Sequence, residues 1–264
     1  MFSDPRLTNF IANLLTALAV GAMLLAALYW ALHRPYFTIR HVELLPMEEA
    51  SLQYVSPTTV EATIAGRLSG NFFSMDLNQV RKVVESAPWV RKARIKRVWP
   101  DRLVVHIEEQ QPLAYWNEGE MINTWGEAFV ANEAVLADGL VLPQLNGPAS
   151  SERLVVQRYA ELARWVAPLG LNIREVSLSP RYAWEVVLSD GVRLNLGRDP
   201  AADIADPHGR SGAVQFAERM QRFVQIWPSL AERLGERRIA SADLRYKDGF
   251  AIVLDPQTIT SVKQ

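Results

Sequence analysis

The sequence predicts an α+β protein with an amino-terminal transmembrane helix, a small domain of strands and helices, and a larger, mostly antiparallel β domain with covering helices. Three observations support this class. Residues 7–32 contain no charged side chain. After them, short alternating segments typical of strands are interspersed with segments whose apolar residues recur at helical spacing. A chain of 264 residues that is 49% hydrophobic and 22% charged is globular in composition and long enough for two folded domains.

The apolar run from Phe10 to Leu32 is long enough to cross a bilayer. Its 23 residues would form a helix of roughly 35 Å, against roughly 30 Å of hydrocarbon. A cleaved signal peptide is the alternative, but its apolar region is shorter, and the nearby Ala-x-Ala at residues 17–19 lies in the middle of the run. We therefore expect a short cytoplasmic tail at residues 1–6 and a transmembrane helix at residues 7–33.

The orientation of this helix does not follow from the flanking charges, since basic residues stand on both sides of it. The large folded body that follows favours a carboxyl terminus outside the cytoplasm, because long domains translocate largely regardless of charge.

Composition argues against several function classes. Lys and Arg number 28 against 29 Asp and Glu, so no strong overall field would recruit nucleic acid. The absence of cysteine excludes thiolate metal sites and cysteine nucleophiles. The four histidines are widely separated, and no serine-hydrolase, penicillin-binding or P-loop motif is present. Glu108 and Glu109 are neighbours in a predicted strand and point to opposite faces, so they cannot flank one bond. We predict no metal, no cofactor and no enzymatic activity.

Residues 36–108 show the order strand, helix, helix, strand, strand. A strand is predicted at residues 37–44. Ser56 and Pro57 begin a first helix, for which Gly70 is the expected C-terminal cap. Asp76 caps a second helix that Pro88 ends. The last two strands, at residues 90–99 and 103–107, form a hairpin that turns at Pro100 and Asp101. This order is that of a POTRA module.

Two features of the hairpin have structural and functional interpretations. Trp89, Trp99 and Pro100 stand at strand ends, and we expect them to be buried against the helices; direct contact with a partner is the alternative. Six basic residues fall within twelve positions, and a solvated strand face is the simpler explanation. The alternative is a surface that faces anionic lipid headgroups or an acidic partner near the membrane. The basic residues are Arg91, Lys92, Arg94, Lys96, Arg97 and Arg102.

Residues 109–264 contain signals for a meander, two helices and further hairpins. Strand-like segments are followed by a helix with apolar residues on one face, and a second helix is expected to be interrupted by Pro228. The predicted strands are residues 113–116, 121–123, 128–130, 173–178, 184–188, 192–196, 239–244 and 250–254, and the predicted helices are residues 152–167 and 213–226.

Seven phrases of the chain, taken together, resemble the FtsQ/DivIB family of bacterial cell division proteins. They occur in the family's order and cover nearly the whole length after the apolar run. The phrases are GNFFSMDL (70–77), APWVRKARIKRVWPDRL (87–103), VHIEEQQPLAYW (105–116), LPQLNGP (142–148), SPRYAWEVVL (179–188), VRLNLGR (192–198) and DLRYKDGFAI (243–252).

The resemblance implies a non-enzymatic scaffold of the inner membrane at the division septum, single-pass, with its bulk in the periplasm. It implies that the last strand of the second domain is a sheet edge that receives a segment of FtsB, which acts together with FtsL. It also implies that the POTRA domain contacts other division proteins. The family's partner surface maps here onto Arg181, Arg245, Tyr246, Gly249, Phe250, Ala251, Ile252, Val253 and Leu254.

Two alternatives and one departure complete the prediction. A membrane-anchored cell-wall enzyme with an unrecognised catalytic site would need convergent carboxylates in a cleft. A POTRA-bearing translocator would need a long transmembrane barrel, for which the residues after position 108 are too few. The segment 199–212 is longer and more acidic than the resemblance leads us to expect, and we interpret it as a surface insertion without an assigned role.

Overall fold

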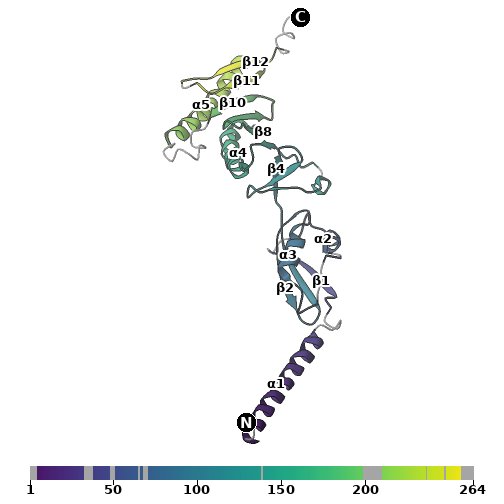
Figure 1. Ribbon diagram of the computed structural model, residues 1–264. Helices are drawn as coiled ribbons and strands as arrows, with labels where there is room; N and C mark the ends of the chain where they lie inside the picture. Colours follow the sequence, from purple (N-terminus) through teal and green to yellow (C-terminus); the bar gives the residue numbers. More distant parts are fainter. Residues whose placement is uncertain are drawn as a thin grey trace. The chain divides into compact units, whose positions relative to one another are not determined.

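The structure is a computed structural model that describes residues 5–32, 38–47, 51–64, 66–67, 71–137, 139–198, 210–235, 237–246 and 248–256. The chain separates into two compact units, Met1–Gln110 and Gln111–Gln264 (Figure 1). Unit 1 contains the apolar helix and the smaller sheet, and unit 2 contains the larger sheet. The two units are described separately below.

The amino-terminal helix α1 spans Pro5–Leu32. Within the described residues it is the one helix that is long and apolar enough to cross a membrane, over Asn9–Trp30. Its apolar side chains are not covered by other parts of the protein. The predicted apolar helix at the amino terminus is therefore confirmed, and it fits a single-pass membrane protein.

The rest of unit 1 has the predicted order of elements. Strand β1 (His41–Pro46) is followed by helices α2 (Pro57–Ile64) and α3 (Leu77–Glu85) and by the hairpin strands β2 (Val90–Val98) and β3 (Arg102–Glu109). The sheet order is β1-β3-β2, so β3 lies in the middle, parallel to β1 and antiparallel to β2. The POTRA-type order predicted from the sequence is confirmed.

Local side chains determine how the elements of unit 1 begin and end. Asp76 accepts a hydrogen bond from the Asn78 backbone N–H at 2.8 Å and caps α3 as predicted. The Glu109 carboxylate accepts backbone N–H groups of Gln53 and Tyr54, each at 2.8 Å, and so holds the segment before α2 against the end of β3. The expected cap Gly70 lies outside the described residues.

The two hairpin tryptophans differ, and one prediction was wrong. Trp89 is buried, and its ring stacks on that of Tyr54 with centroids 4.7 Å apart. Trp99, which we expected to be buried against the helices, is 72% exposed, and Pro100 is exposed beside it. The physical reason is that Trp99 lies in the turn after Val98, the last residue of β2. There the hairpin projects beyond the part of the sheet that the helices cover.

Unit 2 is built on one mixed sheet of nine strands in the order β12-β11-β10-β9-β8-β7-β4-β5-β6. Five of its eight pairings are antiparallel and three are parallel, so the expected mostly antiparallel sheet is confirmed. The strands are β4 (Pro112–Trp116), β5 (Glu120–Asn123), β6 (Ala128–Phe129), β7 (Gln144–Asn146), β8 (Ile173–Leu178), β9 (Ala183–Leu188), β10 (Arg193–Arg198), β11 (Ile239–Asp243) and β12 (Ala251–Leu254).

Strand β7 was not predicted from the sequence, because three residues are too few to show alternation. It lies between β4 and β8 and pairs in parallel with both. It therefore joins the amino-terminal meander of unit 2 to the remaining strands.

Two helices cover the sheet of unit 2. Helix α4 (Glu152–Val166) and helix α5 (Arg210–Leu234) contact each other and contribute buried side chains to the same core (Figure 1). The expected interruption of α5 at Pro228 was wrong, since the helix continues through it. A proline removes one backbone donor, and Phe223 and Trp227, packed ring against ring at 5.2 Å, hold this part of the helix in place. Of the segment 199–212, residues 199–209 lie outside the described residues, and residues 210–212 belong to α5.

A cavity created by mutation at the centre of the smaller sheet should destabilise unit 1 alone. Leu103 lies on the middle strand β3 and is fully buried, so Leu103→Ala should lower the free energy of unfolding of this unit by about 2–5 kcal/mol. Hydrogen exchange of the full chain in detergent, read by peptide, should show lost protection in residues 90–109. Val98→Ala, an exposed site on β2, serves as the control. Equal loss of protection in unit 2 would contradict separate folding of the two units.

Candidate interaction site

Strand β12 forms one edge of the nine-stranded sheet. It pairs with β11 on one side, from Ile239 opposite Leu254 to Asp243 opposite Ala251, and it is the terminal strand of the sheet. The other edge strand, β6, has two residues, whereas β12 has four. An edge strand presents unpaired N–H and C=O groups, so β12 offers the longer backbone template of the two.

The direction of the backbone groups on β12 follows from one hydrogen bond. The Asp255 N–H donates to the Arg238 carbonyl on the β11 side at 2.9 Å. Because backbone groups alternate in direction along a strand, the N–H and C=O of Leu254 and Ile252 point away from β11. These two residues therefore supply donors and acceptors that an added strand would use.

The side chains at and just before β12 alternate between partly buried and exposed. Phe250, Ile252 and Leu254 are partly buried against the core of unit 2. The Phe250 ring meets the Phe223 ring of α5 edge to face, with centroids 5.4 Å apart. On the other face, Val253 is 59% exposed. The edge is thus packed against α5 through Phe250, and no strand among the described residues pairs with its outer side.

Arg245 lies between β11 and β12 and is oriented by Asp243. Its Nε and Nη2 donate to the Asp243 carboxylate at 2.9 and 2.6 Å. Hydrogen bonds from Arg245 lower the pKa of Asp243, so this pair contributes stability above the ordinary pKa of the carboxyl, and the contribution is lost as pH falls through the lowered one. At neutral pH the guanidinium is therefore oriented by Asp243, and within the part of the chain that the structure describes no acceptor binds its Nη1 donors.

A close backbone approach supports this arrangement of Arg245. Gly197 has a φ of 69°, and a Cβ at this position would lie 2.9 Å from the Arg245 Cγ. Only glycine therefore allows the arginine side chain to cross the end of β10 here.

Other cations lie at the same end of the sheet as Arg245. Arg181 is exposed in the turn before β9, and β9 begins opposite the last residue of β10, Arg198. Because one strand separates β9 from β11, the start of β9, near Arg181, and the end of β11, near Arg245, lie on strands about 10 Å apart. Arg198, also exposed, ends the strand between them and was missed in the sequence analysis. Arg198 belongs to the VRLNLGR phrase, but nothing in the local sequence indicated that β10 would lie between β9 and β11.

Tyr246 follows Arg245 and is 57% exposed. Gly249 lies just before β12 and is half-buried. Among the predicted residues, Arg181, Arg245 and Tyr246 thus lie at one end of the sheet. The others, Gly249 to Leu254, lie at the start of the edge strand or along it. Lys247, in the predicted turn of this hairpin, lies outside the described residues.

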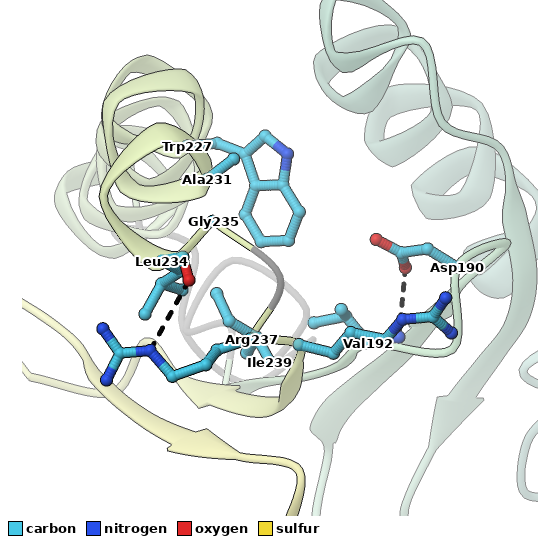
Figure 2. Close-up of a pocket in the computed structure, with 9 residues that line it drawn as sticks. Asp190, Val192, Trp227, Ala231, Leu234, Gly235, Arg237 and Ile239 are labelled. Carbon is cyan, nitrogen blue, oxygen red and sulfur yellow. Dashed lines mark hydrogen bonds between the residues drawn. The ribbon is translucent and has the colours of Figure 1, made fainter. Parts of the chain in front are cut away.

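A pocket of about 460 Å³ lies at the other end of β11 (Figure 2). Its apolar wall includes Trp227 and Leu234 of α5, and Arg237 and Arg238 line it before β11 begins. Asp190 is the one carboxylate among its described lining residues, and it accepts a hydrogen bond from the Val192 N–H at 3.1 Å. The pocket therefore offers an apolar surface beside cations and no pair of convergent carboxylates.

The adjacent carboxylates Glu108 and Glu109, considered above as a possible acid and base, both have structural partners. Glu108 forms an ion pair with Arg91, and Glu109 holds the segment before α2. Among the described residues, no group of three His, Asp or Glu side chains is arranged to hold a metal ion. A second pocket, on unit 1, is lined by Glu85 and Glu108, and both carboxylates have partners: Glu85 accepts the Ala93 N–H at 3.1 Å and Glu108 pairs with Arg91.

Comparisons with known proteins agree with this architecture. Residues 114–245 match the family described as "Cell division protein FtsQ/DivIB, C-terminal", and residues 49–110 match the "POTRA domain, FtsQ-type". The chain is 57% identical to the cell division protein FtsQ of Bordetella pertussis over 97% of its own length and 94% of the relative's. It is 39% identical to that of Burkholderia pseudomallei, over 96% and 94%, and 35% identical to that of Thiomonas arsenitoxydans, over 95% and 88%. The chain belongs to the FtsQ/DivIB family of cell division proteins.

Proposed function

We propose that this protein is a non-enzymatic divisome scaffold that binds the FtsB/FtsL complex by strand addition to β12. The observation that carries the proposal is the outer side of this edge strand, which no described strand pairs with, and on which the backbone N–H and C=O groups of Ile252 and Leu254 point away from β11. An added strand would take its main-chain hydrogen bonds from these residues and its side-chain specificity from the two faces of the edge.

The charge at one end of the edge supports an acidic partner segment. Arg181, Arg198 and Arg245 are exposed there, and Arg245 is held in direction by Asp243. An arginine whose fork is already oriented loses less freedom when a second carboxylate binds. Tyr246 offers an aromatic anchor beside it, a residue type enriched among binding hot spots.

The remaining parts of the protein would place this edge in the cell. We propose that α1 anchors the chain in the inner membrane in the single-pass type II orientation, with the bulk of the chain in the periplasm at the septum. The sheet of unit 1 would contact other division proteins and so link early and late components. Support for this role comes from family membership and from β2, an edge strand of that sheet, and we assign no single residue to it.

Side-chain changes at the end of the edge should weaken binding of an FtsB peptide. Tyr246→Ala should cost about 2 kcal/mol or more of binding free energy if the ring is a hot spot, while Tyr246→Phe should retain most of the affinity. Arg245→Glu should repel an acidic segment, and Arg164→Glu, an equal charge change on the exposed face of α4, should not. Calorimetric titration of the full chain in detergent measures each affinity. Unchanged affinity in both Tyr246→Ala and Arg245→Glu would remove this surface from the site.

A backbone change tests strand addition itself. Ile252→Pro deletes an N–H that points away from β11, so it should abolish peptide binding while the pairing of β11 with β12 is retained. Ile252→Ala shortens the same side chain but keeps the N–H, so it should bind more tightly than the proline variant. The same titration, with circular dichroism as a check of folding, decides between them. If both variants bound equally, recognition would depend on side chains rather than on the edge.

The orientation in the membrane can be tested separately. A reporter active only in the periplasm, fused after Gln264, should give signal, because the long domain after α1 is expected outside the cytoplasm. A reporter active only in the cytoplasm, fused at the same point, provides the matched control and should be silent. The reverse pattern would refute the proposed topology.

A further inference from the structure

The turn of the β2–β3 hairpin exposes a large aromatic side chain. Trp99 is 72% exposed and the adjacent Val98 is 42% exposed, whereas Trp89 at the other end of β2 is 3% exposed. We call residues 98–102 the hairpin tip. An exposed tryptophan is costly in water, and tryptophan is enriched where one side of its ring is apolar and the other wet, as at a membrane surface.

The hairpin tip lies at the end of the sheet where the chain arrives from α1. The Arg40 N–H, just before β1, donates to the Asp101 carbonyl at 2.9 Å, and His41 is in register with Arg102. Helix α1 ends at Leu32 and β1 begins at His41, so eight residues separate them. Fully extended, a segment of this length reaches roughly 28 Å. The tip is therefore tethered within a short distance of whichever membrane surface α1 leaves.

Charges around the tip are predominantly positive. Arg40, Lys96 and Arg102 are exposed, and Lys96 stands on the same side of β2 as Val98, two residues before it. The two nearby acids each lie beside a basic side chain, although the His41 imidazole is a cation only when protonated. Glu43 lies 3.3 Å from Arg102, and Asp101 lies 3.7 Å from the His41 ring. Arg97 points elsewhere and donates to the Met75 carbonyl. The tip and its surroundings thus combine one large aromatic ring with more basic than acidic side chains: Arg40, Lys96 and Arg102 against Glu43 and Asp101.

We propose that the hairpin tip contacts the lipid bilayer, with Trp99 in the headgroup region and Lys96 and Arg40 against anionic lipid headgroups. A bilayer surface is favoured over a protein because the tether keeps the tip close to it in every copy of the chain. The contact would restrict the orientation of the small sheet relative to the membrane. It depends neither on strand addition at β12 nor on which side of the membrane the sheet occupies.

The absence of cysteine allows a direct measurement. The full chain carrying Val98→Cys with a nitroxide spin label is placed in bilayer discs of phosphatidylethanolamine and phosphatidylglycerol. The matched control is Ser86→Cys, an exposed site after α3 and near the start of β2, at the opposite end of the hairpin. Collision rates of the label with oxygen, which partitions into lipid, and with a water-soluble nickel chelate report its depth.

The label at position 98 should show a higher ratio of oxygen to nickel accessibility than the label at position 86. Adding Trp99→Ala should lower the ratio to the control value, with the thermal unfolding midpoint unchanged because the side chain is exposed. Lys96→Gln should lower the population ratio of membrane-inserted to withdrawn hairpin tip about fivefold in anionic discs. The accessibility ratio should fall with it there and should not change in discs of phosphatidylcholine. A label at position 98 that is as accessible to nickel as the control in anionic discs would overturn the proposal and leave a protein partner as the occupant of the tip.

Discussion

The parallel pairing of β11 with β10 is the constraint on which the proposed binding edge depends. Two neighbouring parallel strands require a crossover, and here α5 supplies it. The crossover places α5 over the sheet and returns the chain beside β10. The final hairpin then has one position left, outside β11, so β12 becomes the edge. The same helix contributes Phe223, whose ring holds Phe250 at the start of that edge.

The ends of the strands at this edge also explain why separate basic residues meet. Strands β9 and β12 begin, and β10 and β11 end, at the same end of the sheet. Arg181, Arg198 and Arg245 therefore lie at one end of the sheet although they belong to three separate parts of the chain. Gly197 and Asp243 then direct Arg245 across the end of β10. An acidic segment arriving there would find its cations already arranged, while the backbone of β12 continues the contact along the edge.

The two proposed surfaces use different physics. At β12, unpaired backbone groups of a sheet edge need a polar partner with matching direction, which another strand provides. At the hairpin tip, an exposed ring and a cluster of cations need neither direction nor register, which suits a fluid lipid surface. One surface would thus select a partner, and the other would restrict how the chain stands on its membrane.

The sequence by itself determined the features that depend on neighbouring residues. The apolar helix follows from composition, the cap of α3 from Asp76, and the order of elements in unit 1 from turns and periodicity. Only the tertiary structure decided what depends on distant segments. Trp89 and Trp99 look alike in sequence, yet one is buried because Tyr54 lies over it, and the other extends past the helices. Likewise, a last strand is an edge only if no other strand pairs with its outer side. The grouping of Arg198 with Arg245 required the register of β10 against β11, because pairing between distant strands leaves no local trace in either strand.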